Sequence, residues 1–185
     1  MQRLDPKTTA LLVIDIQERL VPAMEPAAVA RLVKATDLLL EAARLLGVAT
    51  LATEQYPKGL GATIDSLMGP LEQLRCERVS KTCFSAMETP EVGRFLAKLS
   101  PRAVIVVGME THVCVFQTVR ELAARGYEVH VPHDGVASRR DEDRRVGLEL
   151  MQRAGGIVTT SETVVFDWLQ RAEGDAFKAL SKRMR

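Results

Sequence analysis

The feature that most constrains the fold is a regular alternation of short apolar segments with longer segments of helical periodicity. Most of the predicted strands are short apolar runs, and they lie at residues 10–14, 48–53, 78–80, 103–107, 127–131 and 157–160. The predicted helices lie at residues 29–46, 64–74, 89–99, 111–125 and 141–154, with further helical segments from residue 162 onward. Strands that are uniformly apolar and separated by helices are typical of a parallel sheet that is covered on both faces.

This pattern predicts an α/β fold, a three-layer α/β/α sandwich with a mostly parallel, Rossmann-like sheet of six strands. The chain has 185 residues and contains no internal repeat or linker-like segment. At about 150 residues per domain, this length predicts a single domain over residues 1–185.

Charge and cysteine content indicate where such a chain works. Its 25 basic and 24 acidic residues leave a net charge of +1, too small to attract nucleic acid or an anionic membrane. Its apolar runs are too short for a secretory signal or a membrane span. Three cysteines without a CxxC motif indicate free thiols in a reducing compartment. We therefore expect a cytoplasmic protein that binds a small molecule and neither nucleic acid nor a membrane.

Three reactive side chains fall at or near the carboxyl ends of predicted strands, where ligands bind in folds of this class. Asp15 follows the first strand, Lys81 follows the third, and Cys114 lies just inside the helix after residues 103–107. A lysine and a helix N-terminus favour a nucleophilic thiolate, and a carboxylate can accept and return its proton. Spacing alone leaves open the alternative that Cys114 is a small buried apolar residue.

Three motifs occur in order along the chain: LVIDIQ at residues 12–17, SKTCFSA at residues 80–86, and GMETHVC at residues 108–114. Together they resemble the isochorismatase-like cysteine hydrolase superfamily, and the resemblance covers residues 8–160. The EQYPKGLG loop at residues 54–61 and the GMETH form of the third motif are most similar to the isochorismatase-domain-containing subgroup.

The resemblance implies specific roles. Cys114 would be the nucleophile, Asp15 the general acid and base, and Lys81 the third member of the triad. A cis peptide bond is implied between Met109 and Glu110, with the backbone N–H groups of Glu110 and Cys114 forming the oxyanion hole. The family commonly forms dimers or tetramers, so a homo-oligomer is expected. The apolar cluster at residues 164–169 is either an interface or part of the core.

Departures from family members narrow the expected chemistry. Nicotinamidases hold a metal through histidines, but the matching positions here, residues 54–56, contain none. His130 and His133 would point to opposite faces of a strand, and His112 would not face Cys114 on a helix. We therefore expect no metal and no cofactor.

Other residues near the motifs have less defined roles. Gln17, Tyr56 and Phe84 are candidate pocket walls. Two thiols, Cys76 and Cys83, are expected to be structural. Two arginines after the fifth strand either bind a substrate carboxylate or are solvated loop charges; they are Arg139 and Arg140.

The retained cysteine favours acyl chemistry. The predicted function is a metal-independent cysteine hydrolase that cleaves a C–N bond of a small amide, ureide or carbamoyl-type substrate through a thioester on Cys114. One alternative is an isochorismatase-type vinyl-ether hydrolase, in which Asp15 alone supplies the proton. Another is a protein of the same fold that binds small molecules or partners without hydrolysing anything.

Overall fold

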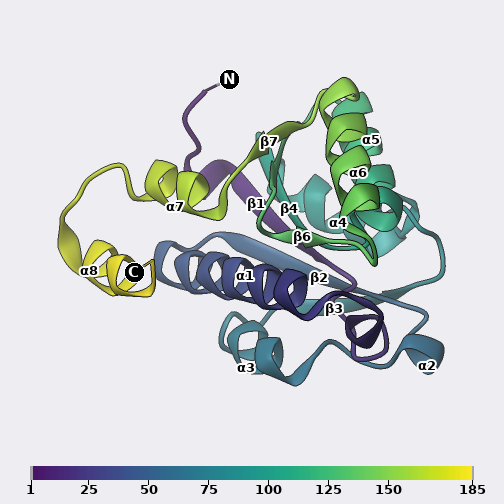
Figure 1. Cartoon of the computed structure of the whole chain (residues 1–185). Helices are drawn as coiled ribbons and strands as arrows, with labels where there is room; N and C mark the ends of the chain where they lie inside the picture. Colours follow the sequence, from purple (N-terminus) through teal and green to yellow (C-terminus); the bar gives the residue numbers. More distant parts are fainter. Residues whose placement is uncertain (1, 185) are drawn as a thin grey trace.

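The computed structural model describes residues 2–184, in which strands and helices alternate along the chain (Figure 1). The strands are β1 (Thr9–Ile14), β2 (Ala49–Gln55), β3 (Glu77–Lys81), β4 (Ala103–Met109), β5 (Glu128–Pro132), β6 (Val136–Ala137) and β7 (Ile157–Thr159). The α-helices are α1 (Pro26–Leu46), α2 (Pro57–Leu60), α3 (Asp65–Gln73), α4 (Pro90–Leu99), α5 (Phe116–Ala124), α6 (Asp141–Arg153), α7 (Ser161–Leu169) and α8 (Gly174–Arg183). Short 3₁₀ turns occur at η1 (Pro6–Thr8), η2 (Val21–Ala23) and η3 (Ala86–Glu88), and one π-helical turn, η4 (Thr111–Val115), precedes α5.

The strands form one sheet in the order β3-β2-β1-β4-β5-β7, and its strands pair in parallel within residues 2–184. The predicted α/β class and parallel sheet are confirmed. The described residues contain seven strands where six were predicted, because β6 pairs with the end of β4. A two-residue strand is too short to show a periodicity in sequence.

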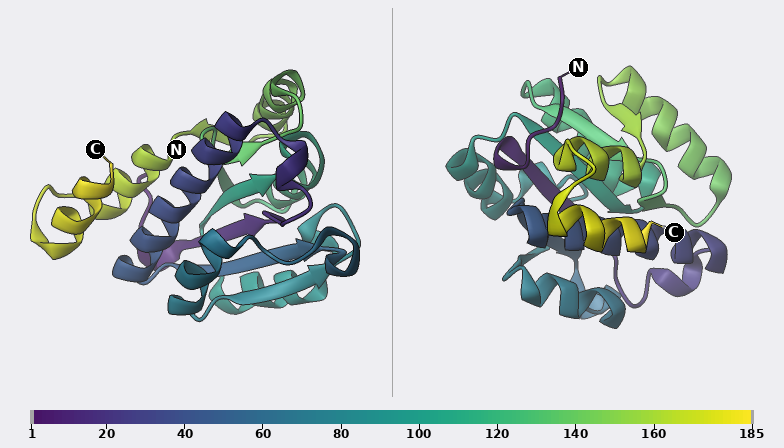
Figure 2. Two further views of the ribbon diagram at one scale, coloured as in Figure 1. Left: turned by 60° about the horizontal axis from the view of Figure 1, so that its bottom comes forward. Right: turned by 90° about the vertical axis from the view of Figure 1, so that its left-hand side faces the viewer.

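Helices cover both faces of this sheet (Figures 1 and 2). Alternate residues of β1 enter different apolar clusters, with Leu11 and Val13 on one face and Leu12 and Ile14 on the other. The first cluster contains buried residues of α1, α3, α7 and α8, and the second contains buried residues of α4, α5 and α6. Strands buried on both faces explain the apolar runs of the sequence.

Local differences from the predicted elements occur near the sheet edge that matters for function. The single helix predicted at residues 111–125 is divided into the π turn η4 and the helix α5. Residues 57–60, predicted to be a loop, form the single helical turn α2.

The apolar cluster at residues 164–169 belongs largely to the core. Val164, Val165 and Trp168 are buried, while Phe166 is 48% exposed. Of the two alternatives from the sequence, the structure places these three side chains in the core.

The chain order reverses between β1 and β4, which lie side by side at the centre of the sheet. Open parallel sheets bind ligands at the carboxyl ends of the strands at such a point. Gly108 lies there with φ +133°, and a Cβ on this residue would overlap the backbone of Ile14. The close approach of the two strand ends therefore requires glycine. No helix within residues 2–184 is long and apolar enough to cross a membrane.

Candidate active site

Asp15 and Lys81 meet at the carboxyl edge of the sheet. Asp15 directly follows β1, and Lys81 is the last residue of β3 on the far side of β2. The Lys81 Nζ donates to Asp15 Oδ2 at 2.6 Å, and both side chains are fully buried. The structure thus brings together two residues that lie 66 positions apart in the sequence.

Neighbouring side chains on β2 hold this pair in place. Thr53 Oγ1 donates to Asp15 Oδ1 at 2.7 Å, and Asp15 N donates to the Thr53 carbonyl at 3.1 Å. Lys81 Nζ also donates to Gln55 Oε1 at 2.6 Å. Each buried charge therefore has hydrogen-bond partners besides the other charge, as a buried ion pair requires.

Thr53 and Gln55 were missed by the sequence reasoning. A signal was present, because they are polar residues two positions apart at the end of a strand, and such residues share one face of the sheet. The argument that selected Asp15 and Lys81 at strand ends applies equally to them.

Cys114 lies on η4, with Asp15 and Lys81 acting on its thiol. Burial and, after it, the Asp15 carboxylate raise the pKa of the Cys114 thiol, Lys81 opposes both, and together they bring the pKa to about 12. The sequence reasoning expected a thiolate favoured by Lys81 and the helix N-terminus. In the structure the thiol stays protonated at neutral pH, because burial and the facing carboxylate outweigh the single ammonium.

The turn that leads to Cys114 begins at a cis peptide bond between Met109 and Glu110, at the position that the resemblance implied. The Glu110 carbonyl accepts from the backbone N–H groups of Val113 at 3.0 Å and Val115 at 3.2 Å. Its carboxylate Oε2 accepts from Arg139 N at 3.1 Å and Arg139 Nε at 3.0 Å. Hydrogen bonds thus hold both the main chain and the side chain of Glu110 in place.

Cys114 is one of the residues that line a small cavity of about 110 Å³. It is lined by Asp15, Leu20, Gln55, Leu60, Phe84, Met109, Glu110, Val113 and Cys114. Asp15 and Cys114 therefore line the same cavity, and the fully buried side chain of Lys81 contacts Asp15.

The expected pocket residues are only partly at this cavity. Phe84 lines it, whereas Gln17 and Tyr56 do not. Gln17 is fully buried, and its Nε2 donates to the carbonyls of Gln55 at 3.0 Å and Gly61 at 2.7 Å. It supports the loop that carries Leu60. Tyr56 is 55% exposed, with its backbone N–H bound to the Lys81 carbonyl.

The arginines and histidines singled out in the sequence lie outside the cavity lining. Arg139 binds Glu110, and Arg140 is exposed just before α6. His112 Nδ1 lies 3.0 Å from Ser138 Oγ, and His130 Nε2 lies 2.9 Å from Glu128 Oε1. Across residues 2–184, no three His, Cys, Asp or Glu side chains gather as metal ligands would.

Known proteins resemble this chain over nearly its whole length. A family model described as the isochorismatase domain matches residues 9–163. The isochorismatase domain-containing protein 1 of Salmo salar is 40% identical over 178 residues, which are 95% of this chain and 60% of that relative. The chain thus spans about three fifths of the length of that curated relative.

Solved structures share the fold. The MAR1 ribonuclease from Caenorhabditis elegans superposes with a TM-score of 0.89 at 36% identity, covering 99% of this chain and 92% of that one. YcaC from Pseudomonas aeruginosa, solved with hexane-2,5-diol and covalent acrylamide, superposes with a TM-score of 0.88 at 21% identity. That pair covers 98% of this chain and 91% of the other. The family match over residues 9–163 and the identity to named relatives show that this chain belongs to the isochorismatase family.

Proposed function

We propose that this protein is a cysteine hydrolase that cleaves the C–N bond of a small amide, ureide or carbamoyl-type substrate. The observation that carries the proposal is that Cys114 and Asp15 line the same small cavity, with Lys81 bound to Asp15 at 2.6 Å. A nucleophile, a proton acceptor and a fixed positive charge are the parts that acyl transfer through a cysteine requires.

In the first step, the Cys114 sulfur attacks the substrate carbonyl while its proton passes to Asp15. The transfer must accompany the attack, because the raised pKa of the Cys114 thiol, about 12, keeps it protonated beforehand. A new S–C bond forms, and the carbonyl electron pair moves onto oxygen. The backbone N–H groups of Glu110 and Cys114 are the proposed donors to this oxyanion.

In the second step, the oxyanion collapses and the C–N bond breaks. Asp15 donates its proton to the departing nitrogen, so that ammonia or an amine leaves and a thioester remains on Cys114. Water then adds to the thioester and gives a proton to Asp15. The C–S bond breaks, the acid is released, and the Cys114 sulfur recovers its proton. Lys81 holds the Asp15 carboxylate in position, balances its charge throughout the cycle, and opposes the rise in the pKa of the Cys114 thiol.

The names of neighbouring structures bear on this proposal in different ways. YcaC was solved with covalent acrylamide, a reagent that alkylates nucleophiles through its C=C bond, and this agrees with a reactive nucleophile in that protein but does not bear on amide cleavage. MAR1 is named a ribonuclease, but a phosphodiester substrate calls for cationic side chains around its phosphate. The described cavity lining contains no lysine, arginine or histidine, and this favours the amide.

Trapping of the acyl enzyme tests the proposal. The protein is mixed with a set of short amides and ureides, quenched in acid and weighed intact by mass spectrometry, while release of ammonia or amine is followed in parallel. We expect a mass increase equal to the acyl group of the reacting substrate, and no increase in Cys114→Ala. Release of ammonia by a folded Cys114→Ala protein at the wild-type rate would refute the thioester.

A further inference from the structure

The cavity beside Cys114 has an unusual balance of charge. Two of its lining residues are acidic, Asp15 and Glu110, and one, Gln55, carries a neutral amide. The rest of the lining is apolar, and consists of Leu20, Leu60, Phe84, Met109, Val113 and the Cys114 thiol. Among the described residues that form this wall, there is no cation to receive a negatively charged substrate.

The nearest cations are already engaged. Lys81 is fully buried, and its Nζ donates to Asp15 and Gln55 at 2.6 Å each. Arg139 binds the Glu110 carboxylate through both its backbone N–H and its Nε, and its side chain is 60% exposed. A substrate carboxylate would therefore have to break one of these pairs to gain a positive partner.

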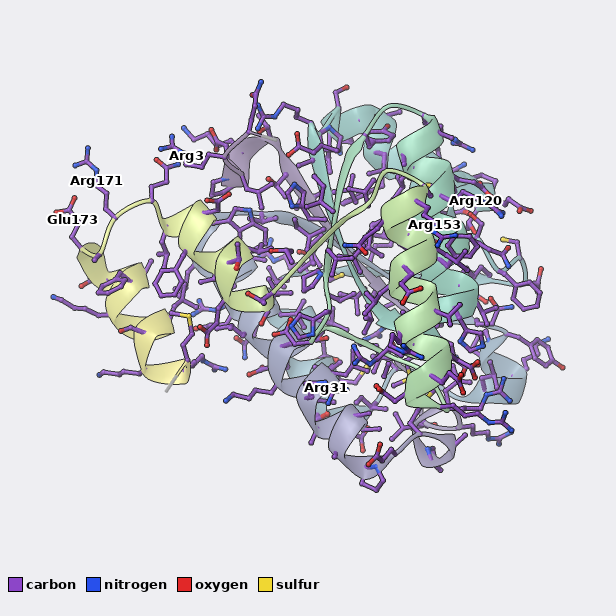
Figure 3. All side chains as sticks on the ribbon, turned by 45° about the horizontal axis from the view of Figure 1, so that its top comes forward. Arg3, Arg31, Arg120, Arg153, Arg171 and Glu173 are labelled. Carbon is purple, nitrogen blue, oxygen red and sulfur yellow. The ribbon has the colours of Figure 1, made fainter. Side chains whose placement is uncertain are left out.

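Other arginines lie on the outside of the molecule. Arg120 on α5 and Arg153 on α6 are exposed on the helical layer that covers one face of the sheet (Figure 3). Neither belongs to the lining of the cavity. These two positive charges thus lie on the surface, while the cavity lining presents carboxylates and apolar groups.

The size of the cavity limits the substrate further. Ligand pockets for larger molecules occupy roughly 300–1,000 Å³. The volume here is about 110 Å³, nearer to the roughly 150 Å³ of an apolar cavity that holds benzene. An acyl group in this space has room for only a few carbon atoms.

From these observations we propose that the site selects neutral amides with a short apolar acyl group, and that the Glu110 carboxylate sets this selectivity by opposing negative charge on the substrate. The inference rests on the proposed amide hydrolysis and specifies its substrate class. A carboxylate on the substrate would meet an apolar wall and two carboxylates whose cations are already engaged, and would lose its hydration without gaining a cationic partner. Glu110 is one of the lining residues, and its carboxylate holds the Arg139 guanidinium, so this cation is not free to receive a substrate carboxylate.

Three amides of similar size are used to separate the effect of substrate charge on kcat/KM from the effects of size and polarity. Isovaleramide, malonamide and malonamate have the same number of non-hydrogen atoms; the first is apolar, the second polar and neutral, the third anionic at pH 7. We expect kcat/KM for malonamate to be at least about 10²-fold below that for isovaleramide, since a nearby charge changes such equilibria by about 10–10³-fold. Malonamide should lie between them.

The same three compounds are titrated by calorimetry into Cys114→Ala, which cannot turn them over. Dissociation constants in the same order support the selectivity independently of catalysis. If none is hydrolysed by the wild type while this order of binding holds, the proposed function fails and the selectivity stands. Hydrolysis with malonamate as good a substrate as isovaleramide, or failure of all three to bind, would overturn the selectivity.

A charge variant tests the role of Glu110. Glu110→Gln keeps the backbone N–H, removes one carboxylate and frees Arg139, so the malonamate to isovaleramide ratio of kcat/KM should rise about 10-fold. Glu128→Gln is the matched control, because Glu128 lies at the start of β5, at the opposite edge of the sheet, and should leave the ratio unchanged. An unchanged ratio in Glu110→Gln, or an equal rise in the control, would show that Glu110 does not set the selectivity.

Discussion

Cys114 and Cys76 have similar thiols in very different surroundings. Burial is the main cause that raises the pKa of each thiol, in both cases to about 12. Cys76 lies just before β3, at the amino edge of the sheet, where its Sγ is 3.4 Å from the Thr50 carbonyl. Cys114 lies at the carboxyl edge, where it faces a cavity and the carboxylate of Asp15.

The similar pKa values mean that thiol acidity does not distinguish the proposed nucleophile Cys114 from Cys76. Both thiols are protonated at neutral pH, and a buried protonated thiol is a poor nucleophile. Cys114 differs from Cys76 because it lines a cavity together with Asp15, whose carboxylate can accept a proton. In the proposed mechanism, Cys114 therefore reacts only when a substrate is present and its proton passes to Asp15.

The largest expected difference in kcat/KM is between the variants that lack the Cys114 sulfur and the Cys76 sulfur. Cys114→Ala should lower amide hydrolysis to background, because no other group can form the thioester. Cys76→Ala should keep kcat/KM within about threefold of wild type, since it lies at the other edge of the sheet and its loss affects packing by about 1 kcal/mol. The measurement is kcat/KM on the amide found by acyl trapping, with circular dichroism to show that both variants fold. Equal losses of kcat/KM in Cys114→Ala and Cys76→Ala would show that Cys114 has no special role in hydrolysis.

Removing the proton acceptor should reduce activity by about 10²–10⁴-fold, the usual contribution of general acid–base catalysis. Asp15→Asn retains the shape of the side chain but cannot take the Cys114 proton. The measurement is kcat/KM on the amide found by acyl trapping, with circular dichroism to show that the variant folds. Unchanged kcat/KM in a folded Asp15→Asn protein would mean that another group accepts the proton.

The smallest expected effect is on stability at alkaline pH, where the two thiols should behave alike. Their folded pKa values of about 12 lie above the ordinary value of 9.0, so the unfolded chain releases these protons first as pH rises. Stability is unaffected below pH 9 and falls between pH 9 and 12, by at most about 1.4 kcal/mol per pH unit for each thiol.

Cys76→Ala and Cys114→Ala should each remove a similar part of this slope. The free energy of unfolding in urea, measured at several values between pH 8 and 10.5, gives the slope for each variant. A slope that depends on Cys114 alone would show that the Cys76 thiol is more accessible to solvent than its surroundings indicate.

Much of the fold follows from the spacing of apolar residues. Runs such as residues 10–14 and 103–107 are apolar at every position, a pattern typical of a strand that is covered on both faces. In the structure these runs form β1 and β4 at the centre of the sheet. The expectation that Asp15 and Lys81 lie at strand ends holds because side chains after parallel strands share one edge. The two-residue strand β6 and the five-residue π turn η4 could not be predicted, since neither is long enough for its pattern to repeat several times.

The sequence by itself determined the strand and helix alternation, the edge of the sheet that carries the reactive groups, and the chemical types present there. Only the tertiary structure decided which neighbours those groups have. Gln17 and Gln55 look alike in sequence, yet one supports a loop from within while the other binds Lys81 and lines the cavity. The protonated state of Cys114 was likewise decided by packing, because burial and the facing Asp15 outweigh Lys81 at that position. Such balances depend on distances across strands that come from separate parts of the chain, and local sequence patterns carry no information about those distances.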